Sequence, residues 1–316
     1  MILRQRDPDD EVEWSDVAEY YNKYTGQNVT RCTIRKGFFL LAPFLEAGAV
    51  NPYQNYDGSS VATRILSVSD FHVPFQLPVS TFEDYIGKVD ILQLNGDISD
   101  CQAISKFPKS YRVSPMEEII ETRKYLIELI DYIKPKKVVA NFGNHEIRFQ
   151  NYLSKNLDSD LLELMPKTSL ELIFVDGFKH YNKRERTKIE YKPLCEVIED
   201  VEIEYTDNWF CQIGKTIFCH PLAFSSGIMK TSENAMNYFR NEGYDFRSLV
   251  MAHTHRVGQY EVGNTTLFEQ GCCCDTKKQH YSDGRLTKSQ KEGFLYICQD
   301  SDGEIIKSKT RLVCLN

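Results

Sequence analysis

Apolar runs that end in side chains able to bind metal ions are the feature that most constrains the fold of this 316-residue chain. Such runs occupy residues 64–69, 90–95, 136–141, 216–219 and 248–252. The residues that follow them are Asp70 and His72, Asp97 and Asp100, Asn144 and His145, His220, and His253 and His255. Five of the seven histidines lie at these places, which random scatter would rarely produce. In open α/β sheets, ligands gather beyond the carboxyl ends of the strands, so the pattern predicts that these residues converge.

Strand-like and helical segments alternate through the first half of the region 59–316. The helical segment 114–133 opens with Ser114, Pro115 and Glu117, a capping box with proline in the first turn. It lies between two strand-like runs, which predicts a sheet with crossover helices. In the second half, Gly-Asn at 263–264 and Asp-Gly at 302–303 separate strand-like runs and predict hairpins. We therefore expect an α/β fold of the αββα sandwich type with mixed sheets.

The residue types at the strand ends suit divalent metal ions. Carboxylate and imidazole groups without thiolates favour borderline ions such as Mn²⁺, Fe²⁺ or Zn²⁺. The candidate ligands outnumber those that one tetrahedral ion takes. We therefore expect two divalent ions, with Mn²⁺ preferred and Fe²⁺ or Zn²⁺ as alternatives.

The order of the motifs resembles that of the calcineurin-like metallophosphoesterase superfamily. Between Ile65 and Arg256 it runs Asp-x-His, Gly-Asp-x-x-Asp, Gly-Asn-His-Glu, a single His, and His-x-His. Two positions depart from the family pattern: Ala252 stands where glycine is usual before His-x-His, and Pro221 follows His220 where glycine is common. Both departures concern the backbone and leave the ligand side chains in place. The resemblance implies a dimetal-dependent phosphoester hydrolase with this fold.

The resemblance also implies which residues hold the metal ions. One ion would be bound by Asp70, His72 and His255, and the other by Asn144, His220 and His253. Asp97 would bridge the two ions. A hydroxide shared by both ions would attack phosphorus in line with the leaving oxygen.

Three further residues of the motifs would act on the substrate or on each other. By the same resemblance, His145 would face the leaving oxygen as a general acid, and Asp100 would orient His145. Glu146 would tie down its loop. Arg148 would either contact a phosphate oxygen or form a salt bridge.

Residues 1–58 differ in composition from the rest of the chain. They contain two short helical patterns around Gly26, with Arg31, Arg35 and Lys36 on the second. One interpretation is a helix-turn-helix that binds DNA. The other is a helical hairpin that packs on the main domain.

The substrate is less constrained than the chemistry. About seventy residues separate Gly-Asn-His-Glu from His220, which predicts an insertion at about 150–213. Within it, residues 178–192 combine basic and aromatic side chains, a pattern typical either of nucleic-acid binding or of a solvated charged hairpin. These features favour a phosphodiesterase or nuclease acting on DNA, RNA or nucleotides.

Two other functions stay open at this point. A phosphomonoesterase of the protein phosphatase type is disfavoured, because Cys101 follows Asp100 where such enzymes usually carry arginine. A metal-stabilised binding module without catalysis is disfavoured by the presence of His145 and Asp100, which the metal ions do not need.

Composition adds few constraints. The net charge of -7 argues against non-specific binding along nucleic acids. The sequence contains no run of about 18 apolar residues, so we expect no membrane span. The ten scattered cysteines do not match a disulfide scaffold, so we expect a reducing, cytoplasmic protein. The run Cys272, Cys273 and Cys274 has no second thiol cluster with which to form a thiolate zinc site, and its role is left open.

Overall fold

The computed structural model describes residues 14–26, 28–36, 60–106, 113–182, 186–278 and 290–315. Contacts divide the chain into two units, Met1–Gly58 and Ser59–Asn316, and each unit is described by itself.

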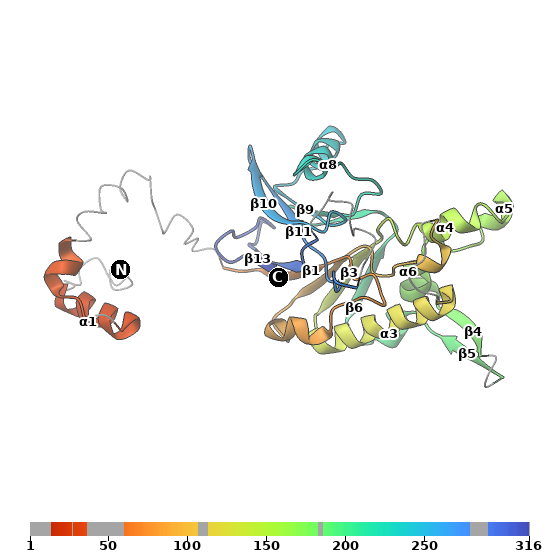
Figure 1. The fold of residues 1–316 in the computed structure, drawn as a ribbon, viewed down its shortest axis with the longest axis horizontal. Coiled ribbons are helices and arrows are strands. Elements are labelled where there is room, and N and C mark those ends of the chain that lie inside the picture. Colours follow the sequence, from red (N-terminus) through yellow and green to blue (C-terminus); the bar gives the residue numbers. More distant parts are fainter. Residues whose placement is uncertain are drawn as a thin grey trace. The chain divides into compact units, whose positions relative to one another are not determined.

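Six strands form the first sheet of the larger unit, in the order β13-β12-β1-β2-β3-β6 (Figure 1). The parallel strands are β1 (Thr63–Val68), β2 (Ile91–Asn95), β3 (Lys137–Asn141) and β6 (Glu202–Thr206). Strand β12 (Gly293–Gln299) runs antiparallel to β1, and β13 (Arg311–Cys314) runs antiparallel to β12. Because β1, β2 and β3 are parallel neighbours, the loops that follow them leave the same edge of the sheet.

Five strands form the second sheet, in the order β10-β11-β9-β8-β7. They are β7 (Phe210–Ile213), β8 (Thr216–Cys219), β9 (Ser248–Met251), β10 (Val257–Val262) and β11 (Thr265–Gln270). Strands β8, β9 and β11 are parallel, whereas β7 and β10 pair antiparallel with their neighbours. The predicted hairpin turn at Gly263 joins β10 to β11, and Gly263 has a φ of 60° there.

Alternate side chains of the strands build the apolar layers. Ile65, Val139, Phe218 and Val250 pack between the two sheets. Their neighbours in sequence face outward and pack in two further clusters, one with helix α3 (Pro115–Ile133) and one with α8 (Lys230–Asn241). Figure 1 shows α3 and α8 on opposite sides of the paired sheets. The predicted αββα sandwich with mixed sheets is therefore confirmed.

Helix α3 begins as its sequence predicts. The Ser114 hydroxyl accepts a hydrogen bond from the Glu117 backbone amide at 3.1 Å, and the Glu117 carboxylate accepts one from the Ser114 amide at 3.0 Å. Pro115 occupies the first turn, where its missing amide proton costs nothing. These contacts start the helix that covers the outer face of the first sheet.

Short elements connect the strands. Helices η2 (Val79–Tyr85) and η3 (Gln102–Ile104) follow β1 and β2. Between β3 and β6 the chain forms α4 (Arg148–Leu153), α5 (Ser159–Leu162), α6 (Ser169–Glu171), η4 (Leu172–Asp176), β4 (Phe178–Asn182), β5 (Thr187–Tyr191) and α7 (Leu194–Val197). Strands β6 and β7, at the end of the predicted insertion of about 150–213, belong to the two main sheets.

The basic stretch 178–192 contains the antiparallel hairpin of β4 and β5, and its residues 183–185 lie outside the described residues. The Phe178 and Tyr191 rings stack with centroids 4.8 Å apart, and Lys179 pairs with Glu190 at 3.2 Å. These two rings and this cation therefore have partners within the hairpin itself.

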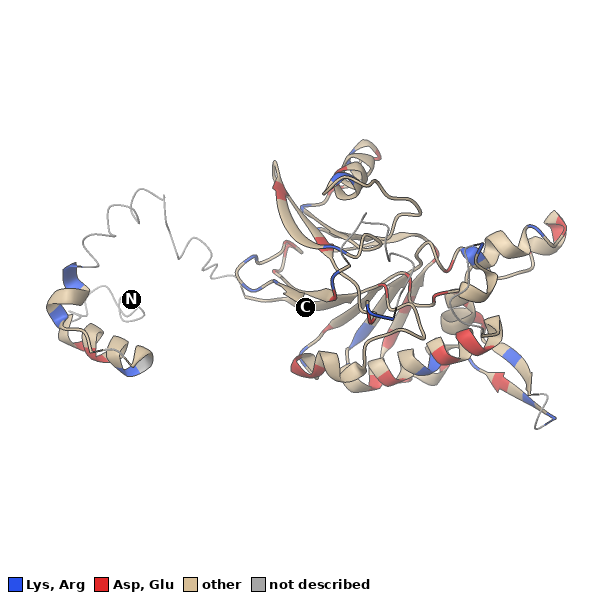
Figure 2. Ribbon diagram, in the orientation of Figure 1, with Lys and Arg blue, Asp and Glu red and all other residues tan. Residues whose placement is uncertain are grey.

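The described residues of the smaller unit, 14–26 and 28–36, contain two helical segments. Helix α1 (Trp14–Thr25) is followed by Gly26 at a φ of 69°, and residues 31–36 are helical. The Asn22 side chain closes the turn by accepting from the Val29 amide at 2.8 Å and donating to the Val29 carbonyl at 2.9 Å. Figure 2 shows basic residues on the second segment and acidic residues on α1.

Within the described ranges, no helix combines the length and apolar composition that a membrane crossing requires.

Candidate dimetal site

The predicted ligands converge where strands of both sheets end. The loops after β1, β2 and β3 come from the first sheet, and those after β8 and β9 come from the second. Most of the ligand side chains are buried: Asp70, His72, Asp97, His220 and His255. Asn144 and His253 are partly exposed, so solvent reaches the site beside them.

One cluster consists of Asp70, His72 and His255. The Asp70 Oδ1 atom lies 3.1 Å from His255 Nε2 and 3.9 Å from His72 Nε2. The two Nε2 atoms lie 3.2 Å apart. Two imidazole nitrogens and a carboxylate oxygen thus converge on one point, as ligands of a single cation do.

A second cluster consists of Asp97, Asn144, His220 and His253. His220 Nε2 lies 3.2 Å from both Asp97 Oδ2 and Asn144 Oδ1. A ring nitrogen of His253 lies within 4.8 Å of the donor atoms of Asp97 and His220. The other ring nitrogen of His220, Nδ1, is 2.7 Å from the carbonyl oxygen of Asn95, which fixes the orientation of the ring.

Asp97 lies between the two clusters. Its Oδ2 atom is 3.2 Å from His220 Nε2 and 3.9 Å from His72 Nε2, so the carboxylate faces a histidine of each cluster. Its other oxygen, Oδ1, accepts a hydrogen bond from the His145 backbone amide at 2.8 Å. The carboxylate therefore connects the loop after β2 with the loop after β3.

The donor set fits two divalent ions. Each cluster offers carboxylate or amide oxygens and imidazole nitrogens, which are the ligand types of borderline cations. The shared carboxylate between the clusters is the arrangement expected of a bridging ligand.

His145, Asp100 and Arg148 form a hydrogen-bonded group beside these clusters. His145 Nδ1 lies 3.0 Å from Asp100 Oδ1 and 2.8 Å from the Asp100 carbonyl. Arg148 donates to that same carbonyl and to His145 Nε2, both at 2.8 Å. His145 thus donates from Nδ1 and accepts at Nε2. Arg148 is engaged with the histidine, and it forms no salt bridge with a carboxylate of the described residues.

Glu146 holds the loops of the site together. Its buried carboxylate accepts hydrogen bonds from the backbone amides of Asp97 at 2.9 Å, Ser99 at 2.9 Å and Gly143 at 2.8 Å. Burial and the nearby Asp97 raise the pKa of Glu146 to about 7. The side chain therefore ties the loop after β2 to the loop after β3.

Two glycines permit the close approach of these loops. A Cβ atom on Gly96 would lie 2.7 Å from both the Gly143 amide nitrogen and His220 Nδ1. A Cβ atom on Gly143 would lie 2.6 Å from the Asp97 amide nitrogen. Any larger residue at either position would push the ligand loops apart.

Most of the ligands have left-handed backbone conformations. Residues Asp70, His72, Asp97, His253 and His255 have φ values of 53°, 48°, 50°, 72° and 51°. Such conformations cost about 1–2 kcal/mol for a residue with a side chain, and they concentrate at functional sites. The fold thus holds these side chains at positions that the local sequence alone does not favour.

The charges of the site act on one another. Burial alone would raise the pKa of Asp70, but the imidazoles of His255 and His220 lower it to about 2. Burial would lower the pKa of His220, but Asp97 and Asp70 raise it to about 9. Burial and the charge of His220 lower the pKa of His253 to about 3. The site therefore combines ionised carboxylates with imidazoles of very different basicity.

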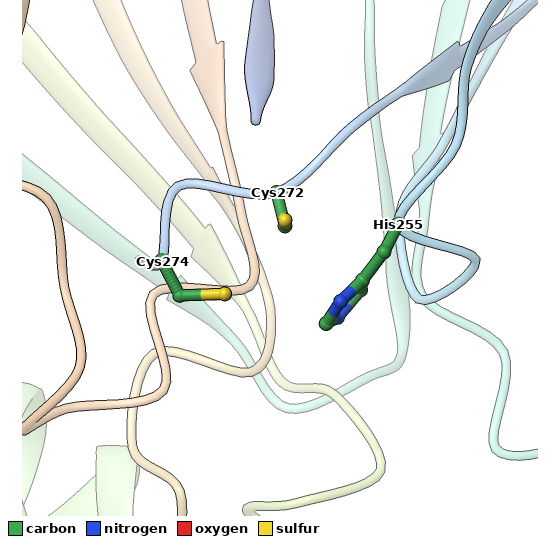
Figure 3. A group of neighbouring side chains, drawn as sticks. All are labelled: His255, Cys272 and Cys274. Carbon is green, nitrogen blue, oxygen red and sulfur yellow. The ribbon is translucent and has the colours of Figure 1, made fainter. Parts of the chain in front are cut away.

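Sequence reasoning did not place the thiols of Cys272 and Cys274 at this site. Both side chains are buried and lie so that their sulfurs and a ring nitrogen of His255 are within 4.8 Å of one another (Figure 3). Neither Cys272 nor Cys274 is part of a disulfide. Cys272 follows strand β11, which runs parallel to β9. The expectation that ligands lie just after the ends of parallel strands therefore also applies to Cys272.

The comparisons with known proteins agree with this geometry. A family model described as calcineurin-like phosphoesterase matches residues 63–257. No sequence of a curated protein matches the chain.

Several solved structures are similar to the chain at low sequence identity. An archaeal phosphodiesterase has 13% identity and a TM-score of 0.36, with 80% of this chain and 99% of that chain covered. Vacuolar Protein Sorting 29 from Cryptosporidium parvum has 15% identity and a TM-score of 0.38, with 81% and 100% covered. The phosphoesterase Yfce from E. coli has 14% identity and a TM-score of 0.32, with 79% and 99% covered.

Proposed function

The chain belongs to the calcineurin-like phosphoesterase family of metal-dependent phosphoester hydrolases, and we propose that it hydrolyses phosphodiesters of nucleic acids or nucleotides. The observation that carries the proposal is the juxtaposition of two ligand clusters with the adjoining group of His145, Asp100 and Arg148, in which Asp100 Oδ1 also lies 3.4 Å from His72 Nδ1. Binding of metal ions alone would not need His145 or Arg148.

The two clusters are the proposed positions of the metal ions. Asp70, His72 and His255 would hold one ion, and Asn144, His220 and His253 the other, with Asp97 shared. When bound, two divalent ions would supply an activated water and stabilise negative charge on the phosphate oxygens. Mn²⁺ is the proposed ion, since carboxylate, amide and imidazole ligands suit it.

We propose that His145 donates a proton to the leaving oxygen. Its Nδ1–H is held by Asp100, which leaves Nε2 as the atom that exchanges a proton with the substrate. Asp100 acts as a positioning residue, because its carboxylate fixes the ring and stabilises the imidazolium. The buried setting of both side chains keeps this pair oriented.

Arg148 is proposed to bind a phosphate oxygen of the substrate. Its guanidinium group now donates to His145 Nε2, which places a positive charge where a phosphate would meet the histidine. A guanidinium group forms strong paired hydrogen bonds with phosphate oxygens. Transfer of Arg148 from His145 to the phosphate would free Nε2 for proton transfer.

Preference for diesters needs contacts beyond the metal ions. A phosphate diester carries one negative charge and a monoester about two at neutral pH, so metal charge alone favours the monoester. Phe224 offers such a contact, because the residue is 48% exposed and its ring centroid lies 5.2 Å from that of His253. An exposed ring beside a metal ligand can stack on a nucleobase.

Cys101 weakens the alternative of a protein phosphatase. Its thiol is buried and lies 3.6 Å from the Ser169 hydroxyl, so it offers no cation to a phosphate group. Burial raises the pKa of this thiol well above its ordinary value. The position therefore serves packing and not phosphate binding.

A substrate panel tests the proposal. The purified chain with Mn²⁺ would be assayed on bis-p-nitrophenyl phosphate, p-nitrophenyl phosphate, single- and double-stranded DNA, RNA and cyclic nucleotides. The Asp97→Asn variant, purified in the same way, controls for contaminating hydrolases. We expect kcat/KM to be higher for nucleotide diesters than for p-nitrophenyl phosphate. Faster turnover of the monoester than of every diester would overturn the diester assignment.

A further inference from the structure

A group of thiols adjoins the proposed dimetal site from the side of His255. The Sγ atoms of Cys272 and Cys274 and a ring nitrogen of His255 lie within 4.8 Å of one another. Figure 3 shows both thiols directed toward the His255 ring from one segment of the chain. All three residues are less than a tenth exposed.

Only one of the two ring nitrogens of His255 faces the proposed dimetal site. Its Nε2 atom faces the proposed dimetal site, 3.1 Å from Asp70 Oδ1 and 3.2 Å from His72 Nε2. Its Nδ1 atom is buried and has no hydrogen-bond partner of good geometry among the described residues. The second nitrogen of a metal-binding histidine nearly always has a carboxylate, carbonyl or water partner, whereas the further side-chain contact of this ring is with the Cys272 thiol.

The backbone holds the thiol segment in place on both sides. Cys273 donates from its amide to the Ser69 carbonyl at 2.9 Å, next to Asp70. Cys272 donates to the Lys291 carbonyl at 3.0 Å, and the Lys291 amide donates to the His255 carbonyl at 2.9 Å. The segment that carries the thiols is thus fixed to the loops that carry two of the proposed ligands.

We propose that His255, Cys272 and Cys274 form a third metal-binding site, which takes a thiophilic ion such as Zn²⁺. Two thiolates and one imidazole are typical zinc ligands, and the Cys-x-Cys spacing delivers both sulfurs from one segment. With Zn–S bonds of about 2.3 Å, tetrahedral geometry sets the sulfurs about 3.7 Å apart. Since the donor atoms already lie within 4.8 Å of one another, the sulfurs need to approach by about 1 Å or less.

The third site shares His255 with the proposed dimetal site. The shared use of His255 rests on the proposed function, whereas the thiol site itself does not. A neutral imidazole gives one nitrogen to a cation, and binding a second cation requires loss of the remaining ring proton. The two cations also repel each other across the ring. Occupancy of one site therefore weakens binding at the other, by equal factors in both directions.

Titration with Cd²⁺ tests the thiol site without an activity assay. Cd²⁺ bound to thiolates gives an ultraviolet charge-transfer absorption that nitrogen and oxygen ligands do not give. We expect the reduced wild-type protein to develop this absorption, and Cys272→Ala and Cys274→Ala to lose it. Cys273→Ala is the matched control, because the Cys273 thiol lies 3.5 Å from the Gly293 carbonyl and packs in the apolar core.

Two outcomes would overturn the proposal. One is the lack of the absorption in the wild-type protein. The other is an absorption that survives in both Cys272→Ala and Cys274→Ala. X-ray absorption at the cadmium edge of the wild-type protein counts sulfur ligands without any mutation, so a misfolded variant would not leave the question open. Two sulfur ligands support the site, and none refutes it.

Competition with Mn²⁺ tests the sharing of His255. Saturating Mn²⁺ should move the Cd²⁺ titration of the thiol absorption to higher Cd²⁺ concentrations. An unchanged titration would refute the sharing, while the absorption itself would still report the thiol site. If the protein proves to hydrolyse no phosphodiester, the thiol absorption is unaffected, so the two proposals fail separately.

Discussion

Replacement of Gly96 by alanine should damage the site through two separable costs. Gly96 has a φ of 73°, a conformation that costs about 1–2 kcal/mol for alanine. The added Cβ would also lie 2.7 Å from the Gly143 amide nitrogen and from His220 Nδ1. Overpacking of this kind costs about 1–3 kcal/mol. We therefore expect Gly96→Ala to lower the free energy of unfolding by about 2–5 kcal/mol.

Gly243→Ala is the matched control for the conformational cost. Gly243 has a φ of 82°, but a Cβ there would meet no atom within 4 Å. This variant should lose only the conformational part, about 1–2 kcal/mol. Urea unfolding of both variants measures the difference, and elemental analysis after Mn²⁺ reconstitution should show metal loss in Gly96→Ala alone. Equal destabilisation with full metal content in both variants would refute the close-approach explanation.

Four further predictions concern the chemistry. His145→Ala should lower kcat by about 10²–10⁴ while the Mn²⁺ content stays near that of wild type, and loss of metal would contradict its assignment. Asp97→Asn should lower the content of both ions, and elemental analysis that shows full occupancy would exclude a bridging role. The pKa of His220 is raised to about 9 in the folded, metal-free protein, compared with about 6.5 in the unfolded chain. Protonation of His220 therefore stabilises the folded state, and this stabilisation is complete below about pH 6.5. That stabilisation should be lost between about pH 6.5 and 9, and Mn²⁺ binding should strengthen over the same range, as melting and titration calorimetry can check. Phe224→Ala should raise KM for oligonucleotides about 5- to 150-fold, the equivalent of about 1–3 kcal/mol of stacking. KM for an abasic oligomer of the same length should not change, and Leu222→Ala, in the same loop, should change neither.

The sequence was sufficient to predict the fold and the convergence of the ligands, because both depend on strong local patterns. Apolar runs of strand length specify the strands, and the capping box at Ser114 specifies the start of α3. Parallel strand order then brings the strand ends together, whatever the distance in sequence. Asp70 and His255, which are 185 positions apart and follow strands of different sheets, were assigned to one cluster by the resemblance of their motifs to the family pattern.

Side-chain partners were harder to predict, since they depend on geometry that local sequence does not encode. Arg148 lies one turn beyond His145 at the start of α4, and only the direction of that helix decides that it donates to His145 Nε2. The sequence contains no second thiol cluster that could pair with Cys272 and Cys274, and their neighbour in the structure is a histidine from another loop. Strand β6 lacks the continuous apolar run of β1, β2 and β3, because it lies at the edge of the sheet and alternates glutamates with Ile203 and Tyr205.

The ligand loops support each other, and this explains why asparagine and not alanine is the informative substitution at Asp97. The strained backbone at Asp70 and His72 is held by amide hydrogen bonds to the carbonyls of Gly96 and Asp97, at 3.1 and 3.0 Å. Asp97 in turn accepts from the His145 amide through Oδ1. Asparagine keeps an oxygen for that bond and removes only the charge that two cations would share. Alanine removes both, so its effect would mix loss of metal with release of the loop that carries His145.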